Sequence, residues 1–203
     1  MNHYARLTCL GLALAFASAA PVFADAQEQP AAPGQQQPAA GAVDAAKDYT
    51  KLMQSAQPAD AIRKYWDMDA MLTGIFGEHL AKQTDAERGE MRRLLVGFVE
   101  KVYANPAIAA AMKQAQFEDF KSSENATAGL TAVSFNVRIQ DKVLPNTLVM
   151  KPVDGGWRIQ DAGTNGRMMV PAIRAEYQRQ AQRVTPLQYI QAMVAPSPQD
   201  KGK

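Results

Sequence analysis

The stretch Val133-Ser-Phe-Asn-Val-Arg-Ile-Gln140 alternates strictly between apolar and polar side chains. Successive side chains of a β-strand point to opposite faces of the sheet, so a period of two predicts a strand with one buried face. Other runs of strand composition flank it at 117–122, 143–151 and 156–162, with turn residues such as Asp154-Gly-Gly156 between them. We therefore expect a four-stranded antiparallel sheet whose strands follow one another along the chain.

Helices are predicted on both sides of this sheet. Before it, apolar residues recur at helical spacing in 42–54, 58–66, 68–80 and 91–103, and a short Ala-rich helix follows at 106–113. Thr84-Asp-Ala-Glu87 and Thr185-Pro-Leu-Gln188 have the form of capping boxes, which begin helices. Pro171 is expected to open a helix after the sheet. The order of helices, sheet and helices predicts an α+β domain with helices packed over one sheet face.

The amino terminus has the pattern of an export signal. Arg6 precedes the apolar run 7–20, and small residues follow up to Ala24. A basic region, an apolar stretch and a small-residue cleavage site in this order predict a signal peptide over 1–24, cleaved after Ala24 or Ala26. The run is shorter than the roughly 20 strongly apolar residues of a membrane span. We expect a mature protein located in the periplasm.

The segments 25–41 and 195–203 contain no large apolar side chain. Such segments bury too little surface to offset the loss of chain entropy, so we predict a disordered linker and a disordered tail. The domain between them, 42–194, has about 150 residues, which is enough for one hydrophobic core.

Charge and cysteine content exclude several classes of protein. The chain has 22 Lys and Arg against 20 Asp and Glu, and removal of 1–24 takes away only Arg6, which leaves 21 against 20. A nearly neutral chain with interspersed charges is not typical of nucleic-acid binding. The single cysteine, Cys9, lies in the predicted signal peptide, so the mature chain has no thiol for a disulfide or a zinc site.

Few side chains are available for catalysis. His79 is the one histidine after the predicted signal, and its place near a predicted helix end favours a surface or terminal role. Asp161 closes the fourth predicted strand. It serves either as a general base or, as we favour, as an acceptor for the amides of the turn 163–166. No nucleophile elbow, phosphate loop or HExxH motif is present. We expect no enzymatic activity, no metal and no cofactor.

Methionine and aromatic residues recur in the predicted helices and strands. Methionine adapts to irregular apolar shapes, including the chains of a ligand. These residues therefore form either a solid core or the lining of an apolar cavity.

Several segments resemble the MlaC family of periplasmic phospholipid carriers. Their order matches the family over about 67–193, although Arg167 replaces a residue that is usually small. The segments are Asp67-Met-Asp-Ala-Met-Leu-Thr-Gly-Ile-Phe-Gly-Glu-His-Leu80, Lys82-Gln-Thr-Asp-Ala-Glu-Arg88, Phe98-Val-Glu-Lys-Val-Tyr-Ala-Asn105, Gly156-Trp-Arg-Ile-Gln-Asp161, Gly166-Arg-Met-Met169 and Arg174-Ala-Glu-Tyr177.

The resemblance implies a nuclear-transport-factor-2-like cone with an apolar cavity that holds phospholipid tails. It also implies exchange of lipid with the lipid-binding ring of an inner-membrane ABC transporter and with an outer-membrane lipoprotein complex. On this basis we predict a monomeric, non-catalytic lipid shuttle. Its predicted lipid-binding residues are Met71, Leu72, Ile75, Phe76, Leu95, Phe98, Val102, Tyr103, Phe135, Val137, Met150, Trp157, Ile159, Met168, Met169, Ile173 and Tyr177.

Two other functions remain open from the residues alone. One is a small-molecule enzyme of the same cone architecture that uses Asp161 as its general base. The other is a non-catalytic interaction module of the cell envelope with a solid core.

Overall fold

The structure is a computed structural model that describes residues 36–55, 58–125, 127 and 129–195. The predicted signal peptide, residues 25–35 of the predicted linker and residues 196–203 of the predicted tail lie outside the described residues. The secondary structure elements, in chain order, are α1 (Gln36–Gln54), α2 (Pro58–Tyr65), α3 (Met68–Phe76), α4 (Glu78–Ala81), α5 (Asp85–Tyr103), α6 (Pro106–Gln114), β1 (Gln116–Glu124), β2 (Thr131–Ile139), β3 (Lys142–Val153), β4 (Gly156–Thr164), β5 (Arg167–Met168), α7 (Met169–Gln178) and α8 (Pro186–Val194).

The four predicted strands form an antiparallel meander, which confirms the α+β class. The sheet has five strands, however, in the order β1-β2-β3-β4-β5, so the predicted number of four was wrong. β5 pairs with the end of β4 through Gly163 and Met168 after a tight turn in which Gly166 has a φ of 73°. A strand of two residues is too short to show an alternating pattern.

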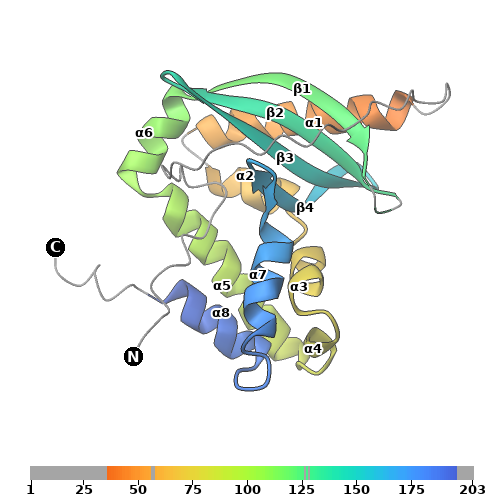
Figure 1. Cartoon of the computed structure of the whole chain (residues 1–203), viewed down its shortest axis with the longest axis vertical. Helices are drawn as coiled ribbons and strands as arrows, with labels where there is room; N and C mark the ends of the chain where they lie inside the picture. The colour runs from red at the N-terminus through yellow and green to blue at the C-terminus, as the bar shows by residue number, and fades with distance from the viewer. Residues whose placement is uncertain (1–35, 56–57, 126, 128, 196–203) are drawn as a thin grey trace.

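One face of the sheet is buried under helices, as the alternation in β2 predicts. Val133, Phe135 and Val137 are buried, whereas Ser134 between them is exposed. α1 crosses this face and contacts β1, β2, β3 and β4 (Figure 1). The other helices, except for α2 and α6, gather beside the sheet, where α5 packs along α8 and α3 packs along α7 (Figure 1).

The junction between α2 and α3 is joined to the sheet through the backbone. The N–H of Asp67 donates to the carbonyl of Ile159 in β4 at 2.8 Å, and Trp66 forms a parallel bridge with the same residue. The Asp67 carboxylate also accepts the Ala70 N–H at 2.9 Å and caps α3. α3 is thereby anchored at the edge of the buried core.

Three helix boundaries differ from the sequence prediction. α7 begins at Met169, so Pro171 is the third residue of this helix instead of its first. α1 begins at Gln36, so 36–41, predicted as part of the disordered linker, are helical in the structure. Ala39 and Ala40 favour helix, and Pro38 is tolerated because the N–H groups of a first turn have no helical partner. The single helix predicted over 68–80 is divided at Gly77, whose φ of 53° suits glycine and separates α3 from α4.

No single helix in the part of the chain that the structure describes is long and apolar enough to cross a membrane. α5 and α6 reach the required length and composition only as a pair, and a bend of 70° separates them.

Candidate ligand-binding site

Most of the predicted lipid-binding residues meet in one apolar core. The sheet supplies Phe135, Val137, Met150 and Ile159, and the helices cover them from the other side. Trp157 and Met169 are partly buried against the same core. The helical residues of the set that are buried in it are Met71, Leu72, Ile75, Phe76, Leu95, Tyr103, Ile173 and Tyr177.

Three predicted residues lie outside this core cluster. Phe98 and Val102 occupy α5 and are half-buried, and Met168 is half-buried in β5. Of the apolar residues predicted to form one broad stripe on α5, the structure buries Met91, Leu95 and Tyr103. The stripe is therefore wider than the surface that the neighbouring elements cover.

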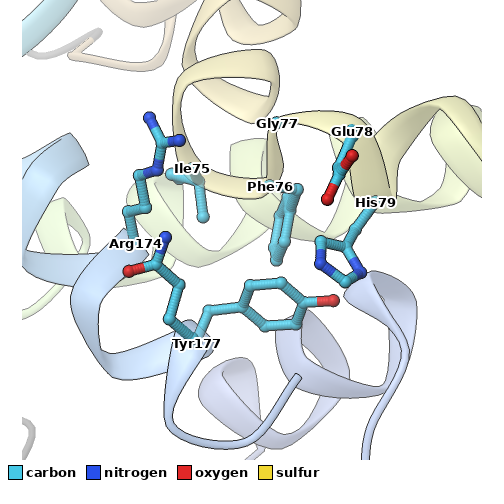
Figure 2. Close-up of a pocket in the computed structure, with 8 residues that line it drawn as sticks. Ile75, Phe76, Gly77, Glu78, His79, Arg174 and Tyr177 are labelled. Atoms are coloured by element: carbon cyan, nitrogen blue, oxygen red, sulfur yellow. The ribbon is translucent and has the colours of Figure 1, made fainter. Parts of the chain in front are cut away.

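A pocket of about 320 Å³ opens where the core ends, between the α3–α4 corner and α7. Three of the predicted lipid-binding residues line it, namely Ile75, Phe76 and Tyr177. Figure 2 shows that the remaining walls are polar. They are formed by the side chains of Glu78, His79, Arg174 and Gln178 and by the backbone of Gly77.

Aromatic rings form the floor of this pocket. The Phe76 and Tyr177 rings meet edge to face with their centroids 4.7 Å apart, and the Tyr189 ring lies 5.4 Å from Tyr177. His79 meets Tyr177 edge to face at 5.5 Å. Such edge-to-face pairs fix ring orientation and stabilise by roughly 0.5–1.5 kcal/mol each. His79 was predicted to have a surface or helix-end role, and it is half-buried in this aromatic group.

The Tyr177 hydroxyl is buried in the pocket wall. Tyr177 is 1% exposed, and its oxygen has no hydrogen-bond partner among the described residues. Burial raises the pKa of this hydroxyl, so it is a neutral donor and acceptor at physiological pH. Buried polar atoms are normally paired, so this hydroxyl is an exception among the described residues.

Two opposite charges stand on the pocket walls. Arg174 comes from α7 and Glu78 from the start of α4, and Figure 2 shows their side chains on opposite sides of the Phe76 ring. Within the described residues, neither forms an ion pair. Arg179, the C-cap residue of α7, does pair with Glu176.

The polar half of this pocket was missed at the level of sequence. Glu78 and Arg174 lie inside two of the segments that resemble the MlaC family, but no role was predicted for them, and about 100 positions separate the two segments that form the pocket. A further signal is the spacing of Arg174 and Tyr177, three residues apart, which places both on one helix face.

Asp161 acts as a cap for α7. Its Oδ1 accepts the N–H of Val170 at 2.9 Å and that of Ala162 at 2.8 Å. Burial raises the pKa of this carboxyl, and hydrogen bonds from the backbone of Val170, Ala162 and Met169 oppose the effect. The predicted role as an acceptor of amides is therefore right in kind, but the principal partner is in α7 instead of the turn 163–166. Asp161 does not line the pocket beside Tyr177.

A second hollow of about 630 Å³ lies between α1 and the start of β1, and none of the predicted lipid-binding residues lines it. Within the described residues, no group of three or more His, Cys, Asp or Glu side chains is arranged to hold a metal ion.

Comparison with known proteins supports the fold. No protein-family model matches the chain, and no curated protein matches it. A solved structure of a phospholipid-binding protein from Ralstonia solanacearum, in complex with a phospholipid, superposes with a TM-score of 0.62 at 13% sequence identity. The match covers 77% of this chain and 98% of that protein. The two chains share a fold in which a sheet is packed against helices.

Proposed function

We propose that this protein binds a phospholipid without catalysis, with the acyl chains held between the sheet and the helices. The observation that carries the proposal is the shared fold with a protein solved in complex with a phospholipid, which the match covers almost completely. The class of ligand fits the apolar side chains that meet between β2, β3, β4 and α3.

The energetics of such a ligand are favourable. Each buried methylene contributes about 0.8 kcal/mol, so one sixteen-carbon chain gains on the order of 10 kcal/mol before ordering costs. Met71 and Met150, which are buried in the core, have flexible side chains that can repack around a chain. The pocket beside Phe76 and Tyr177 opens at the end of the same core and marks an entrance for the ligand.

The proposal extends to a role as a carrier. By resemblance to the MlaC family, the protein would be exported by the signal peptide over 1–24 and would move lipid in the periplasm. Its partners would be an inner-membrane ABC transporter and an outer-membrane lipoprotein complex, and the fold would be the cone implied by that resemblance. Asp161 as a general base is the less favoured alternative, because its carboxylate already accepts two backbone N–H groups.

Lipid extraction tests the proposal directly. The mature protein is purified without detergent from a periplasmic fraction, and bound lipid is measured by native mass spectrometry and by organic extraction. We expect about one phospholipid per chain. Protein that is absent from the periplasmic fraction would contradict export. Folded protein that carries no lipid and takes up none from vesicles would contradict lipid binding and favour an interaction module.

A matched pair of variants locates the bound chain. Leu72 is 1% exposed in the core, and Val153 is 38% exposed at the end of β3. Leu72→Trp fills core volume at a stability cost of roughly 1–3 kcal/mol and should reduce lipid uptake in the folded protein. Val153→Trp adds a similar volume at the surface and should leave uptake unchanged. Equal uptake by the two variants would place the acyl chains elsewhere.

A further inference from the structure

We propose that the pocket between the α3–α4 corner and α7 binds a group that carries a phosphate and an ammonium together, as in the head group of a zwitterionic phospholipid. This inference rests on the proposed function for the source of the group. The chemistry of the pocket is argued from its walls alone.

The charged walls favour a zwitterion. Arg174 and Glu78 line one pocket and have no ion-pair partner among the described residues. A guanidinium binds a phosphate with charge-assisted hydrogen bonds, and a carboxylate binds an ammonium in the same way. Because Figure 2 places the two side chains on opposite sides of the Phe76 ring, one ligand with both charges can reach both walls. A purely anionic group would meet repulsion from Glu78.

The floor of the pocket fits the same ligand. The Phe76 ring lies between the charged walls and is 2% exposed, so it forms an apolar floor that separates the two charges. Gln178 adds an amide to the wall on the side of α7.

The size of the pocket is suitable for a head group and too small for a whole lipid with its acyl chains. Its volume of about 320 Å³ is near the lower end of the range of roughly 300–1,000 Å³ for small-molecule sites. A polar site of this size suits a compact phosphate ester, whereas the acyl chains require the apolar core. The backbone conformation of Gly77, with a φ of 53°, creates the corner that presents Glu78 and His79 to α7.

A competition experiment tests this inference. The mature protein is stripped of lipid and incubated with vesicles of equal parts phosphatidylethanolamine and phosphatidylglycerol, and the bound lipids are counted by mass spectrometry. We expect phosphatidylethanolamine to be enriched about tenfold, the factor that corresponds to one charge-assisted hydrogen bond. Glu78→Gln should abolish the enrichment, and Arg174→Gln should lower the loading of both lipids. Arg179→Gln, at the C-cap of α7 and outside the pocket, is the matched control.

The outcomes separate this inference from the proposed function. Loading with no preference, unchanged in Glu78→Gln and Arg174→Gln, would overturn the head-group pocket while lipid binding stands. Absence of all loading would overturn lipid binding. Glycerophosphoethanolamine is added alone as the soluble source of the same group. If it binds with the same sensitivity to Arg174→Gln while vesicle lipid does not, the chemistry of the pocket is supported and a lipid source is overturned.

Discussion

The Asp161 carboxylate accepts the Val170 N–H at 2.9 Å and thereby joins the end of β4 to the first turn of α7. α7 carries Arg174 and Tyr177, so this bond positions one wall of the pocket. The N-cap residue of α7, Met168, makes no side-chain cap of its own. Asp161 supplies from the neighbouring strand the acceptor that a local cap would otherwise provide.

Removal of the Asp161 acceptor should destabilise the protein. Asp161→Ala leaves amides of the first turn of α7 without this partner, and we expect a loss of about 0.5–2 kcal/mol in the free energy of unfolding. Asp161→Asn keeps an oxygen acceptor and should lose less. Urea denaturation monitored by circular dichroism measures both, and an Asp161→Ala protein as stable as the wild type would contradict the capping role.

The stability difference between Asp161→Asn and the wild type should depend on pH. Burial raises the pKa of Asp161 above its ordinary value, so the folded state disfavours the charged carboxylate. The contribution of Asp161 to stability is therefore complete below the unfolded-state pKa of about 3.9 and falls as the pH rises through the folded-state pKa. The stability of Asp161→Asn relative to the wild type should rise over this window. A difference that is constant with pH would contradict the raised pKa.

Gly74 allows α3 and α7 to approach closely. A Cβ at this position would lie 2.7 Å from Val170 Cγ1, and the branched valine side chain has few alternative rotamers. A Cβ at Gly97 in α5 would have no heavy atom of another group within 4 Å. Gly97→Ala should stabilise by about 0.5–1 kcal/mol through helix propensity. Gly74→Ala should be less stable than Gly97→Ala by roughly 1–3 kcal/mol in urea denaturation.

A double mutant identifies the cause at Gly74. Val170→Ala removes the clashing methyl groups, so its effect in the Gly74→Ala background should be more favourable than in the wild type by at least about 0.5 kcal/mol. Strictly additive effects would show that the strain lies elsewhere.

The two residues of the capping box of α5, Thr84 and Glu87, should each contribute measurably to stability. The Thr84 hydroxyl accepts the Glu87 N–H at 3.2 Å, and the Glu87 carboxylate accepts the Thr84 N–H at 2.7 Å. Thr84→Ala should cost about 1 kcal/mol in thermal or urea unfolding, and Thr84→Ser should restore most of it. No difference between the Ala and Ser variants would contradict the cap.

Glu87 adds a dependence on acid. Its hydrogen bonds from the Thr84 backbone and side chain lower its pKa, so its contribution is present above the unfolded-state pKa and is lost as the pH falls through the folded-state pKa. Glu87→Gln should lack this part of the acid sensitivity, which a comparison of urea midpoints between pH 3 and pH 6 would detect.

Two buried tyrosines should respond differently to loss of the hydroxyl. Tyr49 accepts the Trp66 Nε1–H at 3.3 Å, whereas the Tyr103 hydroxyl has no hydrogen-bond partner among the described residues. Tyr49→Phe leaves a buried donor unpaired and should cost about 1–3 kcal/mol, while Tyr103→Phe should be neutral or stabilising. Chemical denaturation at pH 7 distinguishes them, and the reverse order would contradict the assigned bond.

Tyr49 also predicts a loss of stability in base. Burial raises its pKa to about 12, whereas an unfolded tyrosine ionises near 10. The contribution of the neutral hydroxyl is complete below about pH 10 and is lost as the pH rises toward 12. Tyr49→Phe should lose less stability over that interval, as measured by urea midpoints at pH 9.5 and 11.5.

Local patterns predicted the secondary structure well. The alternation around Phe135 identified β2 and its buried face, and Thr84 and Thr185 marked the starts of α5 and α8. The errors have local causes too. β5 is too short to show a period, and Gly77 ends α3 inside a helical spacing of apolar residues that continues to Leu80.

The sequence by itself determined the elements, the buried faces and the inventory of apolar side chains, because side-chain period and cap chemistry act within a few neighbouring residues. Only the tertiary structure decided that Glu78 and Arg174 face one pocket and that Asp161 caps α7 from β4. These contacts depend on the register of the sheet and on how α3 and α7 dock against it. Packing of the whole core sets both, and no short pattern encodes them.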